Sequence, residues 1–275
     1  MRRIMFFDID GTLVPETGDA IVPQSTVEAL DRAKRAGHLL FVNTGRPAVN
    51  VAGELPGLPF DGFVMGCGTH IVCGEKELFY HTVRRELCLE TANIIRECGA
   101  VPMFERRDRV SFDFTARSLP LIDGIREGFA AQGKDVSHST EDPDFSFDKF
   151  IIAFDGLTDT ARLRPELKKH FFWIERGGGF AEFVPKPYSK ATGIEFVLRH
   201  YGLSKENAYA VGDSLNDLPM FSAVGTSIAM GNGKMLIPYA DHVTDDIDRD
   251  GIYNALRRFG FFEEAQVCST KTENG

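Results

Sequence analysis

The sequence predicts an α/β protein that has a parallel-sheet core and, inserted into it, a second module of the α+β class. Three observations support this. Strand and helix patterns alternate over about the first 65 residues, and the same alternation returns after about residue 187. Between them, several strand patterns follow one another closely. Alternation favours right-handed crossovers and a parallel sheet, whereas clustered strands favour an antiparallel one.

The first part of the chain carries the alternation most clearly. Val27, Leu30 and Ala33 repeat with helical spacing, and Gly37 follows them as a C-terminal cap. Pro47 suits the first turn of a short helix. We therefore expect strands at residues 4–8, 38–43 and 60–65, with helices ending at Gly37 and beginning near Pro47.

The middle of the chain shows a different pattern. We expect strands at 110–114, 149–154 and 180–184, helices at 87–98, 119–132 and 159–170, and a turn at 177–179. The inserted module is expected to span residues 81–186, which leaves 1–80 and 187–275 as one discontinuous core.

The last part returns to alternation. A helical stripe formed by Ala191, Ile194, Val197, Leu198 and Tyr201 stops at Gly202. The remaining expected elements are strands at 208–212, 226–230 and 242–244, helices at 218–223 and 252–259, and a loose polar tail at 263–275.

Composition narrows the class of protein. The 275 residues are 43% hydrophobic and 26% charged, as in ordinary water-soluble globular proteins, and the net charge is −9. An acidic chain is a poor partner for nucleic acid or an anionic membrane. No apolar run approaches the length of a membrane span, and the first residues lack the pattern of a signal peptide. The five cysteines include no Cys-x-x-Cys pair, which favours a reduced, cytoplasmic protein.

Polar side chains follow several of the expected strands. Asp8 and Asp10 come at the end of the first strand, and alternate residues of a strand share a face. Thr44-Gly45 follows the second strand, Lys190 opens a later helix, and 213–217 follow the strand at 208–212. Ligands of open parallel sheets bind outside the carboxyl ends of the strands. We therefore expect these four groups to meet in one crevice.

The chemistry of the four groups suits phosphoryl transfer. Close carboxylates repel, so a site that keeps both needs a cation or a proton, and hard oxygen ligands suit Mg²⁺. A carboxylate is able to attack phosphorus, while a lysine and hydroxyl or backbone donors hold the phosphoryl oxygens. Each group alone also has a simpler interpretation, as a turn residue, a helix cap or a solvated lysine. The combination favours the catalytic interpretation.

The four motifs resemble those of the haloacid dehalogenase superfamily. They are Asp8-Ile9-Asp10-Gly11-Thr12, Thr44-Gly45-Arg46, Lys190, and 212–217, which reads Gly-Asp-Ser-Leu-Asn-Asp. The later segments 228–232 and 250–252 are similar to Cof-type, sugar-phosphatase-like members. The resemblance covers the chain up to about residue 262. It implies a Rossmann-like core with an inserted type IIB cap.

The resemblance also implies a role for each matching residue. Asp8 is expected to be the nucleophile, and Asp10 the general acid and base. Mg²⁺ is expected to bind Asp8, Asp213 and the backbone carbonyl of Asp10. The phosphoryl group is expected to contact Ile9, Thr44, Gly45, Lys190 and Asn216, with Asp217 in support.

Two positions depart from the Cof-type pattern. Cys67 stands in Cys67-Gly68-Thr69 where these relatives carry Asn-Gly-Ala, and Gly233 replaces an alanine after Asn232. In the cap, candidate specificity residues are Glu182 and a basic cluster of Arg106, Arg107 and Arg109, although each also fits a solvated charged face. Phe145, Phe147, Phe150 and Phe154 are expected to pack in a core.

The resulting hypothesis is a Mg²⁺-dependent phosphatase for a small phosphorylated metabolite, such as a sugar phosphate or phosphorylated cofactor. The partner would be that metabolite, with no nucleic acid and no membrane, and the protein a monomer or homodimer. A phosphomutase of the same superfamily and a metabolite-binding regulatory protein with low turnover are the alternatives.

Overall fold

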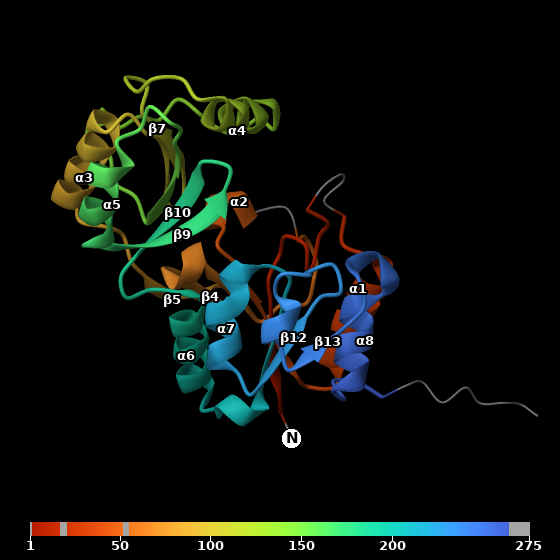
Figure 1. The fold of residues 1–275 in the computed structure, drawn as a ribbon. Helices are drawn as coiled ribbons and strands as arrows, with labels where there is room; N and C mark the ends of the chain where they lie inside the picture. Colours follow the sequence, from red (N-terminus) through yellow and green to blue (C-terminus); the bar gives the residue numbers. More distant parts are fainter. Residues whose placement is uncertain (1, 17–20, 52–54, 264–275) are drawn as a thin grey trace, which may run out of the picture.

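The computed structural model describes residues 2–16, 21–51 and 55–263. Two sheets organise the molecule, and each has its own helices (Figure 1). The lower part of Figure 1 is the core, and the upper part is a second module built from the middle of the chain. We call this second module, from α3 to β10, the cap.

The core sheet has eight strands in the order β13-β12-β11-β1-β2-β3-β4-β5. Its six strands from β13 to β3 pair in parallel, and β4 and β5 form an antiparallel hairpin at one edge. The central strands are buried along their whole length, which agrees with their continuous apolar runs. The strands are β1 (Ile4–Phe7), β2 (Leu39–Asn43), β3 (Gly62–Met65), β4 (His70–Cys73), β5 (Lys76–Tyr80), β11 (Ala208–Gly212), β12 (Thr226–Ala229) and β13 (His242–Val243).

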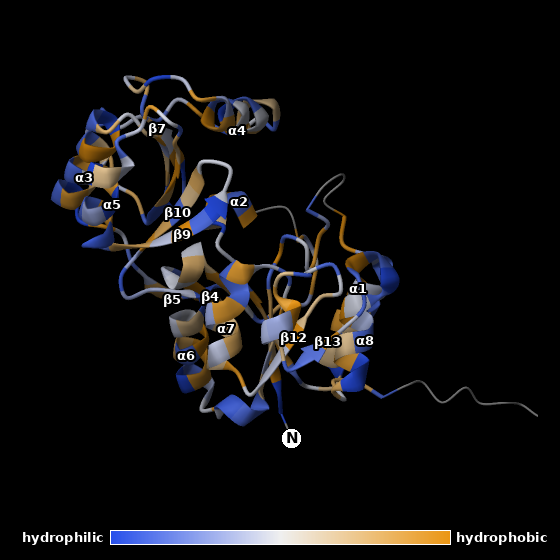
Figure 2. Ribbon diagram, in the orientation of Figure 1, coloured by the Kyte–Doolittle hydropathy of each residue, from blue (hydrophilic) through white to orange (hydrophobic). Residues whose placement is uncertain are grey.

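Helices cover both faces of the core sheet. On one face, α1 and α8 pack against the odd-numbered side chains of β1, Met5 and Phe7. On the other, α6 and α7 pack against Ile4 and Phe6. Hydrophobic and hydrophilic residues alternate along α6 and α8, as expected of helices with one face on a sheet (Figure 2). The core helices are α1 (Gln24–Arg35), α2 (Ala48–Val51), α6 (Lys190–Tyr201), α7 (Leu218–Ala223) and α8 (Gly251–Arg258).

The cap contains an antiparallel sheet of five strands, in the order β7-β6-β8-β10-β9. Helices α3 and α5 pack on one face and α4 on the other, so this sheet also has two hydrophobic layers. The cap elements are α3 (Arg85–Glu97), β6 (Val101–Glu105), β7 (Val110–Phe112), α4 (Pro120–Ala131), β8 (Lys149–Ala153), α5 (Thr160–Lys168), β9 (Phe171–Gly177) and β10 (Phe180–Pro185).

The structure confirms the fold class expected from the sequence. Every expected helix and strand in the described residues is present, with ends shifted by a few residues. Four strands were missed: β4, β5, β6 and β9. Strands β5 and β9 carry charged residues at consecutive positions (Lys76-Glu77, Glu175-Arg176), and β6 contains a proline, so their patterns are weak. All but the first residue of the expected C-terminal tail lies outside the described residues. Within the described part of the chain, no helix has the length and apolar character of a membrane span.

Candidate active site

Asp8 lies directly after β1, in the middle of the core sheet, and is only 4% exposed. The strand order places β11 on one side of β1 and β2 on the other. The loops that follow these three strands therefore meet at one edge of the sheet, as the sequence predicts.

The loop after β11 brings two further acids to this edge. The nearest carboxylate oxygens of Asp8, Asp213 and Asp217 all lie within 4.8 Å of one another. One oxygen of Asp217 accepts hydrogen bonds from the backbone N–H groups of Asp213 at 3.0 Å and Ser214 at 3.2 Å. The Asp217 side chain therefore fixes the shape of the loop as well as adding charge.

Lys190 is the cation of this cluster. Its Nζ lies 2.8 Å from Asp8 and 2.5 Å from Asp217, and the residue is 1% exposed. Ser189 caps the helix α6 at its first turn, and Asn43 donates a hydrogen bond to the Lys190 carbonyl at 3.0 Å. The lysine is thus held on a rigid helix start beside β2.

Asp8 and Asp213 have raised pKa values, because both are buried close to other carboxylates. Burial, and then the charge of Asp217, raise the pKa of Asp8 to about 7. Burial and the nearby Asp8 raise the pKa of Asp213 to about 8. Burial opposes the charge on Lys190, but Asp217 and Asp8 outweigh it and hold the lysine pKa above its ordinary value. A further cation is required for all three acids to be ionised at neutral pH.

Two glycines make room for Asp213. Gly11 has a φ of +74°, and a Cβ added there would lie 2.3 Å from the Asp213 carboxylate. A Cβ on Gly233 would lie 2.4 Å from the Asp213 carbonyl oxygen, so an alanine does not fit this backbone. Thr12 donates a hydrogen bond to Asp213 at 3.0 Å, and Asn232 donates one to the Gly11 carbonyl at 2.8 Å.

The loop after β2 supplies the opposite wall. Thr44 is buried, and its hydroxyl accepts a hydrogen bond from the backbone N–H of Arg46. Arg46 in turn donates two hydrogen bonds to Asp10, from Nε at 2.9 Å and from Nη2 at 2.5 Å. The Asp10 carboxylate is therefore aimed across the crevice toward this loop, while Asp8 faces Lys190.

The cap contributes a charged cluster that the sequence analysis largely missed. Lys149 on β8 lies 2.8 Å from Glu105 and 2.6 Å from Glu182, and donates a 3.0 Å hydrogen bond to the Gly45 carbonyl. Arg176 pairs with the other oxygen of Glu182. We refer to Glu105, Lys149, Arg176 and Glu182 as the cap cluster. Of these, only Glu182 was predicted. The available signal for Lys149 was a lysine directly before the apolar run 150–153, at the first position of the expected strand.

The basic cluster and the phenylalanine run, both expected from the sequence, lie outside the lining of the cavity. The basic cluster forms ion pairs with nearby acids, Arg106 with Asp108 at 2.7 Å and Arg107 with Glu77 at 2.6 Å, and does not contribute to the cavity lining. The phenylalanine run packs in the layer between the cap sheet and α3 and α5, as predicted.

Cys67 lies in the turn after β3 with a φ of 55°. Its thiol lies 3.6 Å from Glu182, and burial together with that carboxylate raises the pKa of Cys67 to about 12. This position thus holds a protonated thiol against the cap cluster.

A cavity of about 730 Å³ lies between core and cap. Asp8, Asp10, Thr44, Gly45 and Asn216 line the core side, and the cap cluster lines part of the cap side. The expected site residues Ile9, Lys190, Asp213 and Asp217 lie directly behind this wall, within the buried cluster or adjacent to it.

Comparison with known proteins gives the family. Residues 5–256 match the haloacid dehalogenase-like hydrolase family. The chain is 27% identical over 271 residues to the putative phosphatase YkrA of Bacillus subtilis, covering 95% of this chain and 99% of that protein. It is 27% identical over 249 residues to the HMP-PP phosphatase of Shigella boydii, covering 84% and 89%. It spans 57% of the length of a putative bifunctional phosphatase/peptidyl-prolyl cis-trans isomerase of Streptococcus pyogenes, with 28% identity.

Solved structures agree with this match. The subclass IIB sugar phosphatase BT4131 superposes with a TM-score of 0.78 at 26% identity, covering 94% of this chain and 100% of that chain. The phosphatase BT1666 of Bacteroides thetaiotaomicron gives a TM-score of 0.80 at 25% identity, covering 95% and 96%. The chain therefore belongs to the haloacid dehalogenase-like hydrolases, and its relatives place it among the phosphatases of that family.

Proposed function

We propose that the protein is a Mg²⁺-dependent phosphatase that hydrolyses a small phosphorylated metabolite through an aspartyl-phosphate on Asp8. The observation that carries this proposal is the buried Asp8 at a strand end, facing Lys190 and two further acids beside a cavity between core and cap. The names of the relatives, an HMP-PP phosphatase and a sugar phosphatase, support a small phosphorylated substrate.

The residues fit a magnesium ion. Three carboxylates converge within 4.8 Å, and two of them have pKa values raised toward neutrality, as expected where a positive charge is needed. Asp8 and Asp213 would hold the ion, with the backbone carbonyl of Asp10 as a further oxygen. Bound there, Mg²⁺ would neutralise phosphoryl charge and orient the phosphate oxygens.

The first chemical step is attack by Asp8. Its carboxylate oxygen forms a bond to phosphorus while the bond from phosphorus to the leaving oxygen breaks, and Asp10 gives that oxygen a proton. Lys190, the Thr44 hydroxyl, Asn216 and backbone N–H groups at Ile9 and Gly45 hold the phosphoryl oxygens. Asp217 positions Lys190, which it contacts at 2.5 Å.

The second step returns Asp8 to its starting state. Asp10 takes a proton from water, the water oxygen bonds to phosphorus, and the bond from phosphorus to Asp8 breaks to release inorganic phosphate. Arg46 orients Asp10 through its two hydrogen bonds for both steps.

The cap closes the site against bulk water. We propose that residues 1–80 and 187–275 form the core and 81–186 the cap, since each has its own sheet and its own hydrophobic layers. The partner is a small phosphorylated metabolite, with no nucleic acid and no membrane, and the protein acts as a monomer or homodimer.

The test is the variant Asp8→Asn, assayed with p-nitrophenyl phosphate with and without Mg²⁺. We expect activity to require Mg²⁺ and the variant to lose more than about a hundred-fold in kcat, about 3 kcal/mol of transition-state stabilisation. The variant should fold, because asparagine preserves the shape of Asp8 and removes a charge that burial opposes. Full activity in EDTA, or a smaller loss of kcat, contradicts the proposal.

A further inference from the structure

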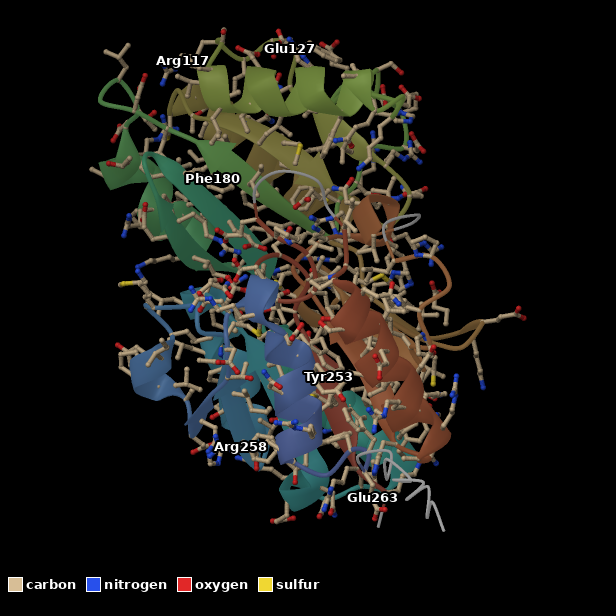
Figure 3. The ribbon with its side chains drawn as sticks, turned by 90° about the vertical axis from the view of Figure 1, so that its right-hand side faces the viewer. Arg117, Glu127, Phe180, Tyr253, Arg258 and Glu263 are labelled. Carbon is tan, nitrogen blue, oxygen red and sulfur yellow. The ribbon has the colours of Figure 1, made fainter. Side chains whose placement is uncertain are left out.

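Beyond the cap cluster, five apolar residues line the cap side of the cavity, together with Gln132 and Lys134 just after α4. Met103 on β6, Ile151 on β8 and Phe180 on β10 line it from the cap sheet, and Ile125 and Phe129 line it from α4. All five belong to one hydrophobic layer between this sheet and α4. Figure 3 shows Phe180 on the cap sheet below α4. We call these five residues the apolar wall.

The register of the cap sheet places a charged pair and an apolar pair at different positions along the same two strands. Glu105 pairs with Lys149, and Met103 pairs with Ile151 two residues further along the same strands. Because alternate residues share a face, the charged pair and the apolar pair line the same side of the sheet. The charged pair lies nearer the core, where Lys149 reaches Gly45.

The charged side chains of the cap cluster form ion pairs mainly with one another. Two cations, Lys149 and Arg176, face two anions, Glu105 and Glu182. Lys149 also donates to the Gly45 carbonyl. Among the described residues of the cluster, Oε2 of Glu105 is buried and accepts no well-aligned hydrogen bond. It does form an ion pair with Lys149. The cluster therefore offers few groups that a substrate hydroxyl could use.

Two contacts hold the apolar wall over the phosphate end. Lys149 joins the cap sheet to the Gly45 loop, and Lys134, just after α4, donates a 3.0 Å hydrogen bond to Asn50 of the core. The volume of the cavity, about 730 Å³, is in the range of pockets that bind small organic molecules. A leaving group attached to a phosphate beside Asp8 would thus extend along the apolar wall.

We propose that this cavity selects phosphate monoesters whose leaving group is a flat, largely apolar ring, with room for one polar substituent at Glu105. A polyol leaving group would place several hydroxyls against the apolar wall without partners, which is costly. This inference rests on the proposed phosphatase function, because the phosphate end of the cavity fixes where the ring lies.

The experiment compares benzyl phosphate with sorbitol 6-phosphate, two esters of primary alcohols, one with an apolar ring and one with a polyol chain. Wild-type protein with Mg²⁺ is expected to show a kcat/KM for benzyl phosphate at least about ten-fold higher. Phe129→Ala should raise KM for benzyl phosphate by about ten-fold and leave kcat nearly unchanged, with little effect on sorbitol phosphate. The matched control is Leu121→Ala on the same helix, because Leu121 is 40% exposed and is not part of the apolar wall.

A binding measurement separates this inference from the proposed function. Calorimetric titration of Asp8→Asn with the two esters is expected to show tighter binding of benzyl phosphate, weakened by adding Phe129→Ala. That result supports the apolar wall even if turnover is absent, in which case only the phosphatase proposal fails. Equal or tighter binding of sorbitol phosphate overturns the inference. Ile125→Ala serves as a second variant if Phe129→Ala fails to fold.

Discussion

Asp8 and Asp213 are acids whose surroundings oppose their charge. Burial and repulsion from neighbouring carboxylates raise their pKa values to about 7 and about 8, against values near 4 for exposed aspartates. Lys190 supplies one compensating charge, but it is shared between Asp8 and Asp217. The two acids are therefore stabilised either by binding a cation or by remaining protonated.

This competition predicts a pH-dependent affinity for Mg²⁺. A raised pKa means that the acids hold protons up to about pH 7 to 8, and these protons must leave before the ion binds. We expect the affinity for Mg²⁺ to increase as pH rises from 6 to 8.5. For each proton released on binding, the affinity should rise by up to about ten-fold per pH unit. Calorimetric titration of the metal across this range measures it.

Asp213→Asn is the control for this prediction. It removes one of the titrating acids, so it should bind Mg²⁺ more weakly and show a shallower dependence on pH. An affinity of the wild-type protein that does not change between pH 6 and 8.5 contradicts the raised pKa values.

Strand β8 carries an ion pair of a different kind from those on the surface. Lys149, Glu105 and Glu182 are all buried, with side chains no more than 7% exposed. Removing one member of a buried ionic group leaves its partners charged and unpaired, and this typically costs 3–5 kcal/mol. Exposed pairs contribute far less, because water already solvates both charges.

Lys149→Met therefore should lower the free energy of unfolding by about 3–5 kcal/mol. Urea unfolding measures the change, and the fluorescence of Trp173, which is the one tryptophan of the chain and lies on β9, reports on the cap. Lys169→Met is the matched control: its pair with Glu166 is 55% and 45% exposed and should change stability by less than about 1 kcal/mol. Equal stability of Lys149→Met and wild type would show that the cap cluster does not stabilise the cap.

The turn after β12 requires glycine at position 233, because there is no room there for a side chain. A Cβ on Gly233 would meet backbone atoms of Asp213 at 2.4 and 2.7 Å, and backbone gives way only at a cost. Gly233→Ala should destabilise the core by about 1–3 kcal/mol and weaken Mg²⁺ binding by moving Asp213. Gly124→Ala on α4 is the control, because nothing lies within 4 Å of its Cβ and alanine favours helix. Thermal unfolding and Mg²⁺ titration measure both variants, and unchanged affinity in Gly233→Ala argues against this account.

At the scale of the whole molecule, the core and the cap each have their own hydrophobic layers. The contacts that join them near the site include Lys149 to Gly45 and Lys134 to Asn50, together with Tyr80 to Asp148 at 2.8 Å. Individual polar contacts hold two units together less firmly than a shared hydrophobic core would. This arrangement therefore favours movement of the cap relative to the core.

This organisation predicts that the cap sets substrate discrimination. A core in which a short linker replaces residues 81–186 should still bind Mg²⁺ and hydrolyse p-nitrophenyl phosphate, since the acids, Lys190 and Thr44 all belong to the core. Its preference for a good metabolite substrate over p-nitrophenyl phosphate, measured as a ratio of kcat/KM values, should fall toward one. A folded core that keeps the full preference contradicts this role of the cap.

The sequence by itself predicted the parallel-sheet core and which polar groups lie together at the candidate site. Alternating patterns predict a parallel sheet, and a parallel sheet brings the ends of its strands to one edge, so Asp8, Thr44 and Asp213 could be placed together without coordinates. The motifs also exposed the unusual positions Cys67 and Gly233, although not what surrounds them. Local pattern suffices here because the topology of such sheets allows few alternatives.

The tertiary structure alone decided what faces the site from the cap. Lys149 and Gly45 are 104 residues apart, and their contact depends on how the two sheets are placed. The apolar wall likewise depends on α4 covering one face of the cap sheet, and its residues read in sequence as ordinary core positions. Periodicity shows which residues share a face but not what that face meets, because the partner is chosen by packing between distant segments.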